Sequence, residues 1–152
     1  RDEVWTILTE PGRSLVANAG VLISSVEHVK PQHSRDFLIL DAGMNDLLRP
    51  ALYQARHSVL PFHQCDQDMQ RYDIVGPVCE SSDTFALRYA LPRLERGDKV
   101  AILTAGAYGA SMSSNYNSRP LAAEAVFHKG KYHLARTRQS LEDLSRDEHP
   151  LD

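Results

Sequence analysis

The chain has 152 residues, 42% of them hydrophobic and 24% charged, which is the balance of one ordinary globular domain. Its formal net charge of -3 gives no reason to expect nucleic acid or an anionic membrane as a partner. No apolar run approaches the ~20 residues of a membrane-spanning helix, and no secretory leader is recognised. Two cysteines, Cys65 and Cys79, are too few for a disulfide framework, so we expect reduced thiols and a cytoplasmic location.

Short strands separated by turn residues dominate the expected secondary structure. We expect strands at residues 4–8, 21–29, 37–40, 57–62, 72–78, 84–91, 99–103, 123–127 and 131–136. Helical turns are expected at residues 14–19, at 45–48 before Pro50, and after Ser140, which has an acidic residue three places later. This pattern predicts a mainly β fold with short helices, arranged as an antiparallel barrel or sandwich.

Two glycine-containing segments have residues suited to an anionic ligand. Glu10-Pro11-Gly12-Arg13 places an acid and a cation around a rigid turn, although such a turn is more often only structural. The Ala105–Gly109 segment follows a strand, and its glycine N–H groups and the Tyr108 hydroxyl could bind an anion, although a structural role is the commoner one.

Arg49 and Tyr53 would lie on one face if a helical turn spans them, and the pair would suit a carboxylate. A surface Arg stacked on a Tyr is an equally good interpretation. His57, His63 and Cys65 match no established zinc spacing, so we expect no metal site. The chain also has no Gly-x-Ser-x-Gly motif of a serine hydrolase.

The run GPVCESSD, residues 76–83, places the thiol of Cys79 beside the carboxylate of Glu80 in a turn after an expected strand. In order, the runs EPGRSLVANAG (10–20), DAGMNDLLRPALY (41–53), GPVCES (76–81), AGAYG (105–109) and MSSNYNSRP (112–120) resemble the C-terminal half of the diaminopimelate decarboxylases. These are pyridoxal-phosphate enzymes of the alanine-racemase-like fold, in which a (β/α)8 barrel precedes a C-terminal β domain. The resemblance spans residues 4–144.

The resemblance implies an activity and a set of cofactor and substrate contacts. Enzymes of this family convert meso-diaminopimelate to L-lysine and carbon dioxide. Glu10 would face the pyridine nitrogen of the cofactor, within the cofactor-binding run that includes Pro11 and Gly12. Arg13 and Tyr108 would contact both the cofactor phosphate region and the substrate. The remaining substrate contacts would come from Arg49, Tyr53 and Glu80, the last meeting the distal amino group.

The resemblance also answers what the thiol is for. In the family, the Cys-Glu turn reaches across a homodimer interface into the partner's active site. Cys79 would be the acid that returns a proton after carbon dioxide leaves, which a thiol with an ordinary pKa of ~8.5 can do. The family usually has Gly where this chain has Ser82, and a side chain there could alter the turn.

The resemblance further implies that half of the active site belongs to a missing N-terminal barrel. That barrel takes ~250 residues and supplies the lysine that holds the cofactor as a Schiff base. We expect residues 1–19 to form its last strand and exit, residues 20–152 to form the C-terminal β domain, and the isolated chain to be inactive. Two alternatives remain open: a related ornithine or arginine decarboxylase, and a non-catalytic binding module.

Overall fold

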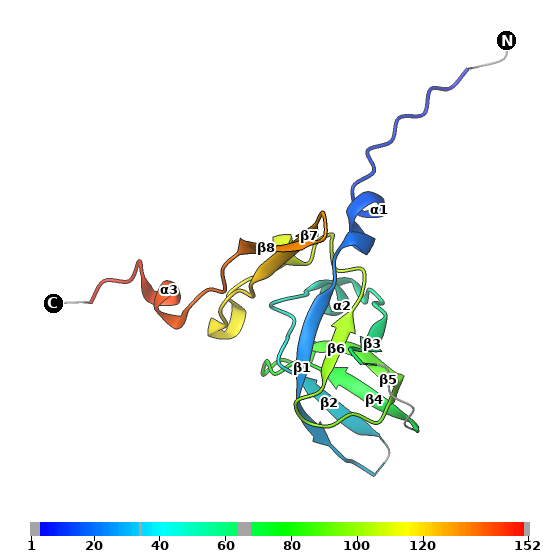
Figure 1. Cartoon of the computed structure of the whole chain (residues 1–152), viewed down its shortest axis with the longest axis vertical. Coiled ribbons are helices and arrows are strands. Elements are labelled where there is room, and N and C mark those ends of the chain that lie inside the picture. The colour runs from blue at the N-terminus through cyan, green and yellow to red at the C-terminus, as the bar shows by residue number, and fades with distance from the viewer. Residues whose placement is uncertain (1–3, 34, 64–67, 151–152) are drawn as a thin grey trace.

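The computed structural model describes residues 4–33, 35–63 and 68–150. The strands are β1 (Leu22–Lys30), β2 (Asp36–Leu40), β3 (Val59–Pro61), β4 (Met69–Val75), β5 (Thr84–Pro92), β6 (Lys99–Ile102), β7 (Glu124–His128) and β8 (Lys131–Arg136). The helices are α1 (Arg13–Val16), α2 (Arg49–Tyr53) and α3 (Leu141–Ser145), with 3-10 turns η1 (Ala17–Ala19), η2 (Ala110–Met112) and η3 (Tyr116–Ser118). The prediction of a mainly β chain with short helices is confirmed (Figure 1).

Six strands form one strongly curved sheet in the order β3-β6-β1-β2-β4-β5. The neighbours are antiparallel except β2 and β4, which run parallel because the chain crosses over between them through α2 and β3. The two edge strands meet where the backbone N–H of Val59 donates to the Tyr89 hydroxyl at 3.0 Å. The sheet is therefore a nearly closed barrel, with one parallel pair that the expected antiparallel arrangement did not include.

The interior of the barrel is filled by aliphatic side chains from its strands. Val26, Leu38, Leu40, Ile74, Val100 and Ile102 are each at most 1% exposed. In β2 the fully buried residues alternate with partly exposed ones, which is the period of two expected when one face of a strand packs on a core. This packed core fixes where the connecting loops leave the sheet.

The prediction of a helix at residues 45–48 is wrong. Residues 44–46 form a turn, and the helix begins later, at Arg49. Pro50 does not stop a helix here; it stands in the first turn of α2, where a missing N–H costs no hydrogen bond and the fixed φ favours the helix.

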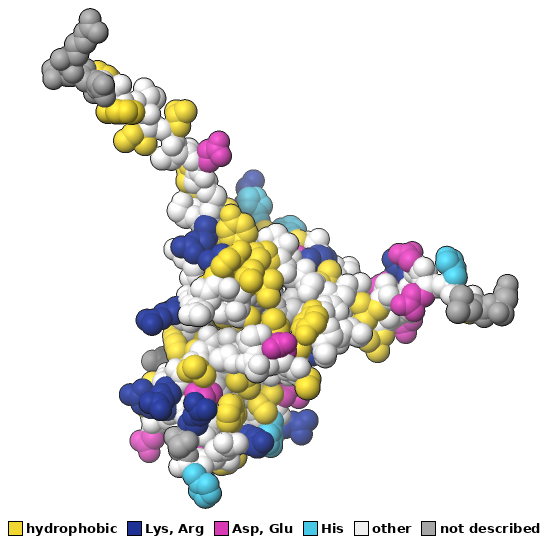
Figure 2. All heavy atoms as spheres, turned by 180° about the vertical axis from the view of Figure 1, so that it is seen from behind, with side chains coloured by type: hydrophobic (Ala, Val, Ile, Leu, Met, Phe, Trp, Pro, Cys, Tyr) yellow, Lys and Arg dark blue, Asp and Glu magenta, His cyan; other side chains and the backbone are white. Residues whose placement is uncertain are grey.

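The strand expected at residues 4–8 is absent. The segment before α1 has no regular secondary structure and projects away from the barrel (Figure 1). It exposes hydrophobic side chains along its length (Figure 2), including Trp5 at 81% and Leu8 at 89%. A strand requires a hydrogen-bonded neighbour, and the structure gives this segment none in the described residues.

The last part of the chain stands outside the barrel. β7 and β8 form a separate two-stranded hairpin, joined by the expected turn at Lys129 and Gly130, which both have positive φ. The helix expected after Ser140 is confirmed as α3, with a capping box between Ser140 and Asp143. No helix in the described parts of the chain is long and apolar enough to cross a membrane.

Candidate active site

The residues singled out in the sequence lie in connections at one end of the barrel. The strand pairing brings the start of β1 to the ends of β2 and β6, and the end of β4 to the end of β2. The segments that meet this end are therefore 10–20 before β1, 41–53 after β2, 76–83 after β4 and 105–109 after β6. The motifs that are scattered in sequence share one end of the fold.

Close backbone contact joins the first and last of these segments. The N–H of Ala105 donates to the carbonyl of Gly20, and the N–H of Gly106 donates to that of Ala17, both at 2.9 Å. A Cβ on either glycine would lie less than 3.0 Å from backbone atoms of the other segment. The Gly106 N–H is thus used for packing and not for an anion, as the commoner interpretation of the motif holds.

Tyr108, Arg49 and Tyr53 form one cluster. The Arg49 guanidinium carbon lies 5.5 Å from the ring centroids of both tyrosines, and α2 presents Arg49 and Tyr53 on one face as predicted. Tyr108 has a φ of 59°, a strained backbone conformation for a residue with a side chain. Its hydroxyl reaches the Gly12 turn, where an added Cβ would meet it at 3.9 Å.

Cys79 and Glu80 sit on an exposed turn after β4. The turn closes on itself, because the Gly76 N–H donates to the Asp83 carbonyl and the Asp83 N–H to the Glu80 carbonyl, each at 3.0 Å. The Glu80 carboxylate accepts the Ser82 N–H at 3.3 Å, so Ser82 is accommodated in the turn. Its hydroxyl also lies 3.9 Å from the sulfur of Met44.

The chain by itself does not join all the predicted residues into one site. Glu10, Pro11 and Arg13 are exposed, as are Cys79 and Glu80. Over residues 4–33, 35–63 and 68–150, no hydrogen bond or ion pair links these side chains to the Arg49 cluster. The residues are displayed at one end of the barrel and left open to solvent.

Two carboxyl groups, the buried Asp83 and the half-buried Asp46, lie beneath this end, and the sequence motifs gave them no role. Burial raises the pKa of Asp83, against the lowering effects of N–H donors from Val78 and Met44 and of the Arg119 charge. Burial likewise raises the pKa of Asp46, whose carboxylate accepts the Gly43 N–H at 3.0 Å. For Asp83, the signal that could have identified it is a carboxylate after two serines, directly before the first residue of β5.

Arg119 and Asn45 complete the support of the 41–46 loop. Arg119 Nε donates to Asn45 Oδ1 at 2.9 Å, and its terminal nitrogen bonds the Asp41 carbonyl. Ser24, which lies in β1, donates a hydrogen bond from its Oγ to Asp41 Oδ1, and the two oxygen atoms are 2.5 Å apart. Arg119, in the MSSNYNSRP run, and Ser24 of β1 therefore hold the loop that leads into α2.

Of the three residues considered as metal ligands, His57 and His63 lie in the described part of the chain. His57 is buried, and its Nδ1 lies 2.9 Å from the Leu103 carbonyl oxygen. This hydrogen bond uses that ring nitrogen within the fold. Cys65 lies outside the described residues. No group of three or more His, Cys, Asp or Glu side chains in the described residues is arranged to hold a metal ion.

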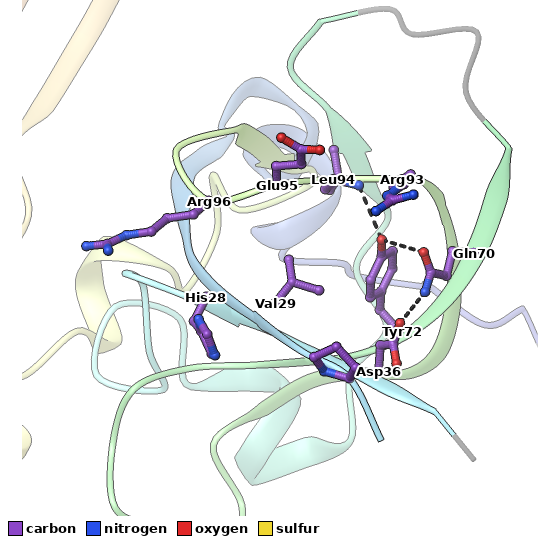
Figure 3. Close-up of a pocket in the computed structure, with 10 residues that line it drawn as sticks. His28, Val29, Asp36, Gln70, Tyr72, Arg93, Leu94, Glu95 and Arg96 are labelled. Atoms are coloured by element: carbon purple, nitrogen blue, oxygen red, sulfur yellow. Dashed lines mark hydrogen bonds between the residues drawn. The ribbon is translucent and has the colours of Figure 1, made fainter. Parts of the chain in front are cut away.

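A cavity of about 530 Å³ opens at the opposite end of the barrel, where β1 ends and β2 and β4 begin (Figure 3). Its polar groups bond to one another: the Tyr72 hydroxyl accepts the Leu94 N–H and donates to Gln70, each at 3.2 Å, and Gln70 bonds Asp36. This network holds the loop after β5 on the sheet.

Comparison with known proteins decides the family. Residues 14–106 match the family described as pyridoxal-dependent decarboxylase, C-terminal sheet domain. The chain belongs to the pyridoxal-dependent decarboxylases. Within them, it is 51% identical over 146 residues to diaminopimelate decarboxylase of Zymomonas mobilis, a match that covers 96% of this chain and 34% of that protein. The chain thus spans about a third of the length of the curated relatives it matches.

Solved structures of decarboxylases share the fold of this domain to different degrees. Diaminopimelate decarboxylase from Helicobacter pylori, complexed with L-lysine, is 50% identical with a TM-score of 0.84, over 90% of this chain and 34% of that one. Lysine/ornithine decarboxylase from Vibrio vulnificus, complexed with cadaverine, is 28% identical with a TM-score of 0.67, over 74% of this chain and 31% of that one. The likeness is greater to the first kind of decarboxylase.

The residues of this decarboxylase domain fit the pyridoxal phosphate that the family uses. The Tyr108 hydroxyl is a hydrogen-bond donor beside Gly12, which has no side chain to fill the space between them. The exposed guanidinium of Arg13 suits a phosphate or a carboxylate. Lys30 and Lys99 lie at the opposite end of the barrel, and Lys129 and Lys131 lie on the separate β7–β8 hairpin.

Proposed function

We propose that the chain is the C-terminal domain of a pyridoxal-phosphate-dependent diaminopimelate decarboxylase of the cytoplasm. The reaction would convert meso-2,6-diaminopimelate to L-lysine and carbon dioxide in lysine biosynthesis. The observation that supports this most is the gathering of the motifs, which resemble those of that enzyme over nearly the whole chain, at one end of the barrel. Identity of 51% to a relative of that name supports the same substrate.

The cofactor would supply an electron sink for the bond that breaks. Glu10 would hold a proton at the ring nitrogen, with Pro11 and Gly12 shaping the turn around it. Arg13 and Tyr108 would bind the phosphate region and approach the substrate.

Arg49 and Tyr53 would bind the carboxylate of the substrate that is retained. The flat guanidinium, already held against two rings, can make paired hydrogen bonds to a carboxylate. Glu80 would bind the distal amino group as a counter-charge. A glutamate after the cysteine favours diaminopimelate over ornithine, whose enzymes typically have an aspartate there.

Cys79 would donate the proton to the carbon that has lost carbon dioxide. In the proposed homodimer, the exposed turn would enter the partner's active site, which agrees with the exposure of Cys79 and Glu80 to solvent in one chain. The missing barrel would supply the cofactor-anchoring lysine, with residues 1–19 as its last strand and exit and residues 20–152 as the β domain. The isolated chain is then inactive.

The test uses the full-length enzyme that contains this chain. Decarboxylation of meso-diaminopimelate, ornithine and arginine is compared, and we expect a clear preference for the first; a preference for ornithine or arginine would establish the related decarboxylase instead. Borohydride reduction with pyridoxal phosphate should give an adduct on a barrel lysine and none on this chain alone. No adduct on either would support a non-catalytic module.

The cysteine is tested separately. Cys79→Ala should lower turnover by about two orders of magnitude, the usual range for losing a general acid, while cofactor absorbance is kept. Cys65→Ala, outside the shared motifs, is the matched control. Unchanged turnover in Cys79→Ala would refute the assignment of the proton donor.

A further inference from the structure

One buried carboxylate connects the Cys79 turn to the loop that leads into α2. Asp83 is 3% exposed, and its Oδ1 accepts the Met44 N–H at 2.7 Å while its Oδ2 accepts the Val78 N–H at 2.8 Å. Val78 directly precedes Cys79, and Met44 lies in the turn before α2. Each oxygen therefore serves a different segment.

Two glycines make room for this connection. A Cβ on Gly76 would lie less than 3.0 Å from both carboxylate oxygens of Asp83. A Cβ on Gly43 would lie 3.1 Å from Cγ2 of Val78, so the two segments pack together tightly beside the carboxylate. Neither glycine has a positive φ, so close approach is the reason for them here.

The loop on the Met44 side is itself held firmly, so it can act as a frame. Asn45 accepts a hydrogen bond from Arg119 through its side chain, and its carbonyl accepts the Ser114 N–H at 2.9 Å. Ser24 of β1 bonds both the Asp41 carboxylate and the Ala42 N–H. Through Asp83, the exposed turn is tied to a part of the domain that several elements fix.

We propose that Asp83 is a positioning residue for the decarboxylase, which sets the place of Cys79 by binding the turn to the 43–46 loop. The catalytic part of this proposal rests on the proposed function. Because Cys79 would act in the partner's site while Arg49 acts in its own, one carboxylate would connect the residues that a chain contributes to two active sites.

The decisive substitution is Asp83→Asn, which keeps size and shape. An amide has one oxygen, so its NH2 group must face one of the two N–H donors and that contact is lost. Asp46→Asn is the matched control, since that half-buried carboxylate accepts the Gly43 N–H within its own loop and has no hydrogen bond to the Cys79 turn. The two variants remove the same charge from neighbouring positions.

Two readouts are compared in the full-length enzyme. Alkylation of Cys79, followed by peptide mapping so that Cys65 is counted separately, should be at least about threefold faster in Asp83→Asn, because a loosened turn would leave the covering site of the partner in the proposed dimer more often. The value of kcat should fall by about tenfold to a hundredfold, the range for a reacting group out of place. In Asp46→Asn the alkylation rate should stay that of the wild type.

Each outcome either supports or overturns the proposal. If Cys79 is alkylated in Asp83→Asn at the same rate as in the wild type, the proposal is overturned. A changed alkylation rate with an unchanged kcat also overturns it. If the wild-type enzyme fails to decarboxylate diaminopimelate, the proposed function fails, and alkylation still decides whether Asp83 holds the turn. If Asp83→Asn does not fold, amide exchange in the wild type replaces it: Met44 and Val78 must be protected, and rapid exchange at both overturns the proposal.

Discussion

Arg49 shows how a single side chain can be prepared for its ligand. Its guanidinium carbon lies 5.5 Å from the centroids of two tyrosine rings, which is within the range of a cation–π contact with both. Lysine keeps the charge but cannot stack flat or bind a carboxylate through two parallel bonds. We therefore expect Arg49→Lys to weaken substrate binding more than it slows the chemical step.

In steady-state kinetics of the full-length enzyme, Arg49→Lys should raise KM for diaminopimelate about tenfold, equivalent to about 1.4 kcal/mol, with kcat changed less. Arg35→Lys is the control, because Arg35 also lies over an aromatic ring, that of Phe37, at the other end of the barrel. An unchanged KM in Arg49→Lys would show that Arg49 does not bind substrate.

Asp83 also makes a prediction about pH. Burial raises its pKa in the folded protein, so the folded state binds a proton more readily than the unfolded state does. The stability that this group contributes is therefore fully present below its ordinary pKa and is lost as pH rises through the raised value. The neighbouring Asp46 strengthens the shift and Arg119 weakens it.

Melting temperatures of wild type and Asp83→Asn, measured from pH 7 down to pH 4, test this sign. The wild type should gain stability relative to the variant as pH falls, because protonation removes the cost of a buried charge. A difference that stays constant with pH would show that the carboxyl has the same pKa in the folded and unfolded states.

At the scale of elements, the contact of Gly20 with Gly106 fixes the segment before β1 against the segment after β6. Gly106→Ala would force its Cβ against the Val16 carbonyl, so we expect a loss of about 1–3 kcal/mol in the free energy of unfolding. Gly12→Ala is the control, because its nearest contact is an ordinary 3.9 Å, and it should change stability by less than about 0.5 kcal/mol. Denaturant titration of both variants measures the difference, and equal stabilities would show that the segments separate at little cost.

Local pattern predicted most elements because alternation and turn residues are local signals. The hairpin of β7 and β8 and the cap of α3 follow from a few neighbouring residues. Pro50 misled the helix prediction, since one residue type both stops helices and starts them. The parallel pairing of β2 with β4 depends on contacts distant in sequence, which no local signal encodes.

The sequence motifs predicted the candidate site residues themselves, but not the residues that hold their loops in place. The motifs identified Arg49, Tyr108 and Cys79, and the resemblance gave them roles. The contact of Asp83 with the Met44 N–H, at 2.7 Å, joins residues 39 positions apart in sequence, so no local pattern could predict it. Residues that bind each other across the fold are the ones that sequence patterns miss.

At the scale of the whole molecule, one face of the hairpin outside the barrel is apolar and uncovered. Phe127 pairs with Tyr132 and Ala125 with Leu134 on this face, and Phe127, Tyr132 and Leu134 are 62%, 81% and 67% exposed. A two-stranded hairpin is marginally stable alone, and such a patch is rarely left bare. We expect the isolated chain to cover it by self-association.

Sedimentation velocity over a range of concentrations should show the isolated chain passing from monomer to larger species. Leu134→Ser should shift that transition to about tenfold higher concentration, since losing most of one buried leucine contact costs about 1.4 kcal/mol or more. Leu87→Ser on β5 is the matched control, because Leu87 is 65% exposed but lies on the barrel and not on the hairpin. Equal shifts in the two variants would mean that general hydrophobicity drives association, and a monomer at all concentrations would mean that the hairpin face stays in water at no measurable cost.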